Sequence, residues 1–316
     1  EKNFIRQYSR GTVASVYDQI EKDLLEGLPY IDDKIYKVPK YHFNRAAANA
    51  FAARFYLYKK DYNKVIQYAS QAVPNNNFRP NLRPWNTEYS TIGLNEIAPR
   101  YAKATENANL LLAETASYWF RTNIAARYAL SPSVRDQILR AVPAAGGQWA
   151  FATGFYVDNH IIVPKISEYF VSVSVNAEIG NGFVMVPLFT VEEVLFNLAE
   201  AYTYNGDFTT AINLLNDYLS TRIQNYNSSY LLTAAKINSY YGTANTQQGL
   251  INAILDYRRS EFVHEGLRWF DILRYKLPVV HQTITGETLR LPPNDPRRVF
   301  QIPATAKQSG IEQNPR

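Results

Sequence analysis

Apolar residues recur three and four positions apart in several stretches of the chain, a spacing that places side chains on one face of a helix. The first such stretch is residues 13–25, where polar residues occupy most of the other positions. Thr12 or Ser15 can cap the start of this helix, and Gly27 with Pro29 can end it. The pattern therefore predicts an amphipathic helix near the beginning of the chain.

Two further stretches, residues 44–73 and 191–219, each predict a pair of helices joined by a short turn. Superposing the turn at Asp61 on the turn at Asp207 brings the apolar positions of the two pairs into register. This is the helix-turn-helix pattern of a tetratricopeptide-type (TPR) repeat. Because the two turns lie 146 residues apart, other structure must be inserted between the pairs.

The inserted region, residues 79–187, is rich in Asn, Pro, Gly and aromatic residues. Short apolar runs at 110–113 and 161–163 predict buried strands, and alternation at 170–175 predicts a half-exposed strand. We interpret this region as long loops with a few short strands, carried on a rigid helical frame. Loops held in this way often contain recognition residues.

The remaining pattern predicts one long helix over residues 250–277, followed by an ordered, meandering tail over 278–316. The expected fold class is therefore mainly α, with TPR-like hairpins as a scaffold and a loop-rich insert with a few short strands. We expect one domain over 1–316. Its parts are a helical scaffold (1–78), a ligand-binding insert (79–187), and the second hairpin with the long helix and the tail (188–316).

The composition of the chain excludes several kinds of site and partner. The 316 residues include no cysteine, which excludes disulfides, thiolate metal sites and a cysteine nucleophile within this sequence. The net charge of +5 is scattered, and residues 166–250 carry seven acidic and two basic side chains, so no nucleic-acid partner is expected. No apolar run approaches the about 18 residues of a membrane helix. No nucleotide or phosphate motif occurs, so no cofactor is expected.

The densest charge cluster lies in the predicted helix over 250–277. Glu261 and Glu265 are one turn apart, which would suit general acid–base chemistry. Each carboxylate has an arginine within one turn, however, so we favour a structural ladder of ion pairs. The expected pairs are Arg258 with Glu261, Glu265 with Arg268, and Asp271 with Arg274. A zinc motif starting at His264 would need its second ligand at Arg268, and the other histidines are far apart, so no metal site is expected.

The 24 Tyr, 16 Phe and 4 Trp residues give the chain many flat apolar side chains. Trp269 lies on an apolar helix face and is expected in the core. The other three tryptophans lie in loop-like stretches beside amides and arginines, where an indole can stack on a sugar ring while its neighbours bind hydroxyl groups. The alternative is that these tryptophans form a small core under the loops. The predicted ligand-binding residues are Trp85, Asn86, Tyr118, Trp119, Arg121, Gln148 and Trp149.

Several segments, in order along nearly the whole chain, resemble the SusD/RagB family of surface nutrient-binding lipoproteins of Bacteroidetes. They are the opening helix, the stretches 45–73 and 186–202, the charged helix from Asp256, and the ending Gln313-Asn314-Pro315. The charged helix is similar to the family's signature. Thr190, in the stretch 186–202, departs from the family pattern, since the family usually has Arg there. The residues that match the signature are Arg258, Glu261, Glu265, Gly266, Arg268, Trp269, Asp271 and Arg274.

The resemblance implies a non-enzymatic binding protein with four TPR-like hairpins and a shallow site on the loops opposite them. Such proteins capture oligosaccharides on the extracellular face of the outer membrane and deliver them to a SusC-like TonB-dependent transporter, whereas RagB-type members bind peptides. They are attached through a lipidated N-terminal portion, which this chain is expected to lack.

Two other functions compete with nutrient capture. A glycoside hydrolase needs two carboxylates about 5–9 Å apart in one cleft, and the acidic residues of 79–165 show no pairing beside the aromatic loops. A TPR-type peptide adaptor would hold its ligand in the concave helical groove, whereas a glycan receptor would use the inserted loops. In the receptor the TPR faces are expected to dock on the transporter.

Overall fold

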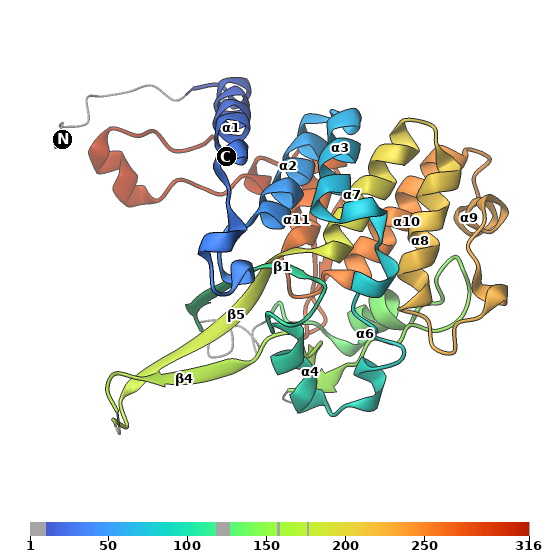
Figure 1. The fold of residues 1–316 in the computed structure, drawn as a ribbon, viewed down its shortest axis with the longest axis horizontal. Helices are drawn as coiled ribbons and strands as arrows, with labels where there is room; N and C mark the ends of the chain where they lie inside the picture. The colour runs from blue at the N-terminus through green and yellow to red at the C-terminus, as the bar shows by residue number, and fades with distance from the viewer. Residues whose placement is uncertain (1–10, 118–126, 157–158, 176, 316) are drawn as a thin grey trace.

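The computed structural model describes residues 11–117, 127–156, 159–175 and 177–315. The fold is mainly helical with a few strands, which confirms the predicted fold class (Figure 1). The helices are α1 (Val13–Gly27), α2 (Arg45–Lys59), α3 (Tyr62–Ala72), α4 (Leu94–Tyr101), α6 (Pro132–Arg135), α7 (Val191–Tyr204), α8 (Phe208–Ser220), α9 (Ala234–Tyr241), α10 (Thr246–Glu261) and α11 (Leu267–Arg274).

The two predicted hairpins are confirmed as α2–α3 and α7–α8. Both second helices begin at an aspartate cap: Asp61 accepts a hydrogen bond from the backbone N–H of Lys64 at 3.2 Å, and Asp207 accepts one from that of Thr210 at 3.0 Å. Helix α3 packs against α7, so hairpins far apart in sequence lie side by side (Figure 1). The two hairpins therefore form one continuous helical frame.

We call the side of the frame that carries the loop region (79–187) the loop side. A three-stranded antiparallel sheet crosses it, with the strands in the order β1-β5-β4. Its strands are β1 (Asn109–Ala116), β4 (Glu168–Ser172) and β5 (Gly180–Thr190). The strands predicted at 110–113 and 170–175 are confirmed, but β5 was not predicted, because its sequence leads directly into α7. Thr190 ends β5 and caps α7, its Oγ1 accepting from the Glu193 N–H at 3.3 Å, so this departure from the family pattern has a structural role.

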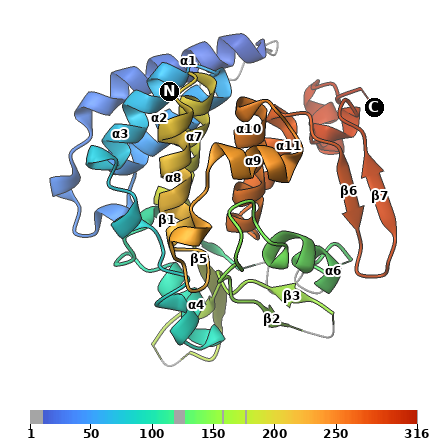
Figure 2. The same ribbon diagram turned by 90° about the vertical axis from the view of Figure 1, so that its right-hand side faces the viewer.

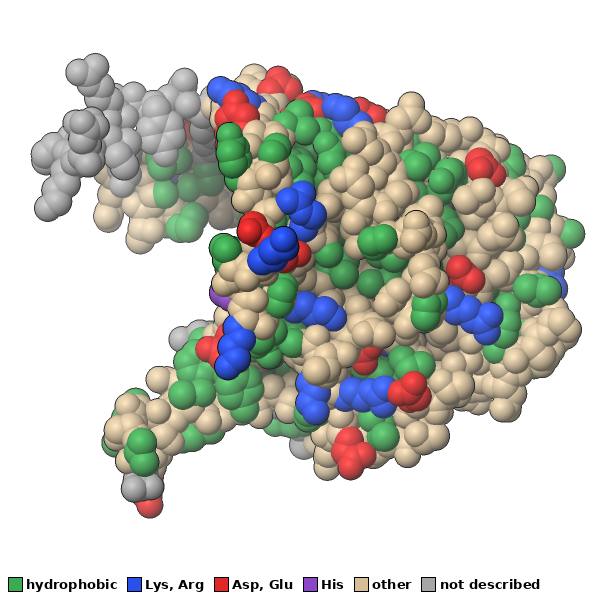
Figure 3. Space-filling view, viewed as in Figure 1, with side chains coloured by type: hydrophobic (Ala, Val, Ile, Leu, Met, Phe, Trp, Pro, Cys, Tyr) green, Lys and Arg blue, Asp and Glu red, His purple; other side chains and the backbone are tan. Residues whose placement is uncertain are grey.

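Strands β4 and β5 form a long hairpin that projects from the body (Figure 1), with apolar side chains along it (Figure 3). Phe170, Val175 and Ile179 are exposed on this hairpin. A shorter hairpin, β6 (Val279–Gln282) with β7 (Thr288–Leu291), belongs to the tail and stands at the right-hand edge of the view in Figure 2. The predicted run at 161–163 is a two-residue strand, β3 (Ile161–Ile162), paired with β2 (Gly154–Phe155).

The single helix predicted over residues 250–277 is wrong. Helix α10 ends at Glu261 and α11 begins at Leu267. Between them, His264 and Gly266 have φ angles of 70° and 77°, a left-handed backbone that a right-handed helix does not contain. The apolar spacing continues on both sides of the break, so periodicity did not reveal it.

The break changes the pairing of the charges. Among the described residues, the only predicted pair that is present is Asp271 with Arg274, at 2.8 Å. Arg258 reaches across the break to Asp271 at 2.9 Å, and Glu265 binds Lys165 of the loop region at 2.6 Å. The carboxylates of the signature therefore connect separate segments, and Asp271 also pairs within its own helix. Trp269, which was expected in the core, is only half-buried.

Candidate functional site

The structure separates the predicted ligand-binding residues. Trp85 is fully buried, with its ring among those of Tyr89, Tyr101 and Phe151 at centroid distances of 5.0, 6.3 and 5.3 Å. Its prediction as a stacking surface is wrong, because the loop region folds over its own aromatic core and leaves this indole no open face. Tyr118, Trp119 and Arg121 lie outside the described residues.

Asn86 has a positioning role in place of an open ligand-binding one. Its side-chain N–H₂ donates to the backbone carbonyls of Ser220 at 2.9 Å and Ile223 at 2.8 Å. These bonds fix the segment that follows α8 against the loop region. The amide donor that sequence reasoning assigned to a ligand is therefore committed to the protein backbone.

Gln148 and Trp149 do lie together, at a pocket of about 370 Å³ that we call the amide pocket. Backbone bonds fix its shape: the N–H of Gln224 donates to the carbonyl of Gln148 at 2.9 Å, and that of Ala150 to the carbonyl of Arg222 at 2.8 Å. The lining residues are Leu139, Arg140, Gln148, Trp149, Phe151, Thr153 and Gln224.

Trp149 is 7% exposed, so its indole contributes an edge to the amide pocket rather than an open face. The ring packs against Phe151, Tyr218 and Tyr257 at centroid distances of 5.7, 6.3 and 5.6 Å. Gln148 is exposed, and the Gln224 side chain donates to the Trp149 carbonyl at 3.1 Å. Gln224 was missed by the sequence reasoning, since it follows a helix outside the loop region.

Four charged side chains from four separate segments form a buried group, which includes the Arg222 whose carbonyl binds Ala150. Arg83 binds Glu192 at 2.8 Å, and Arg222 binds both Glu192 at 2.9 Å and Glu261 at 2.8 Å. None of the four side chains has any exposed surface. Although burial opposes it, Arg83 and Arg222 hold the pKa of Glu192 below its usual value. We call these residues the charge network.

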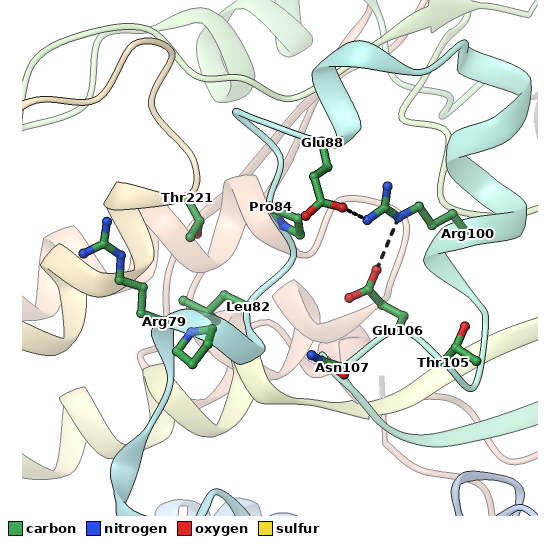
Figure 4. Close-up of a pocket in the computed structure, with 10 residues that line it drawn as sticks. Arg79, Leu82, Pro84, Glu88, Arg100, Thr105, Glu106, Asn107 and Thr221 are labelled. Atoms are coloured by element: carbon green, nitrogen blue, oxygen red, sulfur yellow. Dashed lines mark hydrogen bonds and ion pairs between the residues drawn. The ribbon is translucent and has the colours of Figure 1, made fainter.

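A second cavity, of about 440 Å³, is lined mainly by charged and polar side chains, and we call it the charged pocket (Figure 4). Arg100 stands between Glu88 and Glu106, bound to Glu88 and 3.8 Å from a Glu106 oxygen. Glu106 also accepts a hydrogen bond from the Tyr89 hydroxyl at 2.7 Å. Because the chain folds back between positions 88 and 106, these two carboxylates of the insert share one arginine, a neighbourhood that their sequence positions did not indicate.

In the described part of the chain, no three His, Asp or Glu side chains are grouped so that they could hold a metal ion. Over the same residues, no helix combines the length and the apolar character needed to cross a membrane.

Comparisons with known proteins identify two matching family models. Residues 1–57 match a model described as starch-binding and associating with the outer membrane. Residues 170–315 match the model of the SusD family. A comparison with curated proteins found no match.

The fold also matches crystal structures from Bacteroides. A SusD superfamily protein from B. thetaiotaomicron is 19% identical with a TM-score of 0.63, over 97% of this chain and 67% of that one. A SusD-like carbohydrate binding protein from B. vulgatus is 18% identical with a TM-score of 0.60, over 95% and 65%. A SusD superfamily protein from B. fragilis is 18% identical with a TM-score of 0.60, over 95% and 63%.

The chain thus spans about two thirds of the length of these structures. The two family models match the beginning and the C-terminal half of the chain, and the shared fold extends over nearly all of it. On these matches, the chain belongs to the SusD/RagB family.

Proposed function

We propose that the protein captures oligosaccharides on its loop side, without altering them, and delivers them to a SusC-like TonB-dependent transporter. The family supports this proposal, since one matching model is described as starch-binding and associating with the outer membrane. A structure with the same fold is described as a carbohydrate binding protein. We further propose that it acts at the extracellular face of the outer membrane, attached through a lipidated N-terminal portion, with the TPR faces docked on the transporter.

The observation that carries the proposal is the composition of the amide pocket. Gln148, Gln224, Thr153 and Arg140 place amide, hydroxyl and guanidinium groups around one aromatic edge, with no carboxylate among the lining residues. Amides can both donate to and accept from sugar hydroxyls, and an aromatic edge excludes water from the apolar face of the ring. We include Tyr118, Trp119 and Arg121 in the proposed site on the strength of their chemistry alone.

The charged pocket provides the test against hydrolysis. Glycoside hydrolysis needs one protonated carboxyl group and one ionised carboxylate. Glu88 and Glu106 both lie against Arg100, whose guanidinium stands between the two carboxylates and takes the place that a glycosidic bond would need (Figure 4). We therefore expect no reducing sugar to be released from any bound glycan. Release that is lost in the variant Glu106→Gln would show an enzyme instead.

Isothermal titration calorimetry against a panel of polysaccharides and their oligosaccharides tests the binding itself. We expect at least one glycan to bind, and binding to weaken in the double variant Gln148→Ala/Gln224→Ala. The variant Gln71→Ala, on the exposed surface of α3, is the matched control. Unchanged affinity in the double variant would remove the amide pocket from the site.

A RagB-like peptide-binding function is the second candidate, and one further cavity favours it. This cavity, of about 320 Å³, lies on the helical frame and is lined by side-chain amides and by Tyr204 and Tyr275. Amides of this kind can pair with the peptide backbone. Binding of a peptide mixture that is lost in Asn252→Ala, with no glycan bound, would favour this candidate over glycan capture. A TPR-type adaptor would instead bind a folded protein partner, and that binding would likewise be lost in Asn252→Ala.

A further inference from the structure

A smaller cavity, of about 220 Å³, adjoins the amide pocket. The two share Trp149, and successive residues of the 137–141 segment line one or the other. Helix α10 supplies Asp256, Tyr257 and Arg259 to the smaller cavity, and α9 supplies Tyr240 and Tyr241. We call it the arginine pocket.

Among the residues that the structure describes, no counter-charge contacts the guanidinium of Arg259. Arg259 is half-buried, and it makes no hydrogen bond or ion pair with the described residues. The nearest carboxylate in the pocket, Asp256, instead accepts a hydrogen bond from the Tyr241 hydroxyl at 2.8 Å. A partly buried charge without a partner destabilises the fold unless a ligand supplies the opposite charge.

Electrostatics support the same conclusion. Burial lowers the pKa of Arg259, and Asp256 offsets this only in part. Arg268 of α11 is close enough to be affected: burial, and then the charge of Arg259, lower its pKa too. Arg268 is otherwise bound to a backbone carbonyl, that of Leu255, at 3.1 Å. The region around Arg259 therefore has more positive charge than its carboxylates balance.

The other walls of the arginine pocket suit a ring. Tyr240 and Tyr241 lie edge to face, with ring centroids 4.9 Å apart and an interplanar angle of 75°, and Trp149 closes the side shared with the amide pocket. Tyr257 is 1% exposed, and its hydroxyl proton has no acceptor among the described residues. The pocket thus combines one unpaired cation, flat apolar walls and a hydroxyl, which match a carboxylate attached to a small ring.

We propose that the arginine pocket binds the carboxylate of an acidic sugar, so that the captured oligosaccharide contains uronic acid units. The proposal rests on the proposed glycan-binding function and names its substrate class. Because the two pockets adjoin at Trp149, one oligosaccharide places a uronic acid in the arginine pocket and its neighbouring unit in the amide pocket.

The test compares oligosaccharides that differ only in charge. Oligomers of galacturonate, of mannuronate and of glucuronate-bearing xylan are titrated calorimetrically against their fully methyl-esterified forms. For the wild type we expect at least one acid to bind about tenfold or more tightly than its ester, because a charge-assisted hydrogen bond is lost in the ester. The preference should decrease with added salt.

Three variants separate the pocket from general charge. Arg259→Gln is expected to abolish the preference for the acid, and Arg259→Lys to keep part of it. Arg290→Gln, at an exposed position of β7, is expected to keep all of it. Since Arg259 has no bonded partner in the described part of the chain, Arg259→Gln should melt at the wild-type temperature or above, which shows that the variant is folded.

The outcomes distinguish the two proposals. If esters bind as tightly as acids, or if Arg259→Gln keeps the preference, the acidic-sugar inference is wrong while glycan capture stands. If neither acids nor neutral glycans bind, the proposed function fails and the inference fails with it.

Discussion

The side-chain Nε of Arg222 lies 2.8 Å from Oε2 of Glu261, and neither side chain has any exposed surface. Arg222 follows α8, and Glu261 ends α10. The Tyr218 hydroxyl also donates to the same carboxylate at 3.1 Å. The donors from α8 and from the segment that follows it therefore fix this carboxylate in place at the end of α10.

Replacing Glu261 with Gln should destabilise the protein by about 3–5 kcal/mol, since it leaves the Arg222 charge buried with one carboxylate partner fewer. Urea unfolding followed by circular dichroism measures the change. The matched control is Glu287→Gln, which breaks an exposed ion pair with Arg127 and should change stability by less than about 1 kcal/mol. If both variants lost the same stability, burial would not be the reason for the large effect expected at Glu261.

The predicted role of Gln148 can be tested without disturbing the fold. Gln148 is exposed, so Gln148→Ala should leave stability within about 0.5 kcal/mol of the wild type. Affinity for the best glycan should decrease about two- to tenfold, the effect of one neutral hydrogen bond. Trp149→Ala is a poor probe of binding, because truncating this buried side chain should destabilise the protein by about 3–5 kcal/mol. An affinity unchanged in Gln148→Ala would exclude a direct contact with the ligand.

Replacing each of two glycines by alanine should affect the stability of the protein differently. Gly266 has a φ of 77°, and no described residue apart from its chain neighbours lies within 4 Å of an added Cβ, so Gly266→Ala should destabilise the protein by about 1–2 kcal/mol through backbone strain alone. Gly27 ends α1 with an equally open environment and an ordinary helical backbone. Gly27→Ala should therefore be neutral or stabilise by up to about 1 kcal/mol. Thermal melts of both variants give the comparison.

His264 should make stability depend on pH below neutrality. Burial, and then the charge of Lys165, lower its pKa to about 4, while an unfolded histidine titrates near about 6.5. Protonation therefore favours the unfolded chain. This contribution is complete above pH about 6.5 and is lost as the pH falls toward 4, by about 3 kcal/mol in total.

The variant His264→Asn provides the control for this pH dependence. Asn tolerates the left-handed backbone at this position and does not titrate. Denaturant unfolding of both proteins between pH 7 and 4 should show a smaller decrease for the variant. Parallel curves would mean that other groups cause the loss.

The helical hairpins could be predicted from sequence because their causes are local. The Asp61 and Asp207 caps and the apolar spacing around them lie within one helical turn of the positions they define. The break at His264 and Gly266 could not, since the apolar pattern is the same whether the helix continues or restarts. Only the glycine carried a signal, and glycine also occurs within helices.

The binding residues were predicted less well, for a related reason. Trp85 and Gln148 both lie in polar, loop-like sequence, yet one is fully buried and the other exposed. The difference is set by contacts with Phe151 and with the segment after α8, which are distant in sequence. Residue type indicated the chemistry of the site, but tertiary packing decided which side chains remain open to a ligand.

The charge network ties the insert to three parts of the helical frame, so the loop side should not melt separately from the rest. Under that coupling, a ligand held on the loops raises the unfolding temperature of the whole chain by mass action. A dye-monitored thermal-shift assay on the unlabelled protein can therefore serve as a rapid first screen for ligands, ahead of the calorimetric titrations.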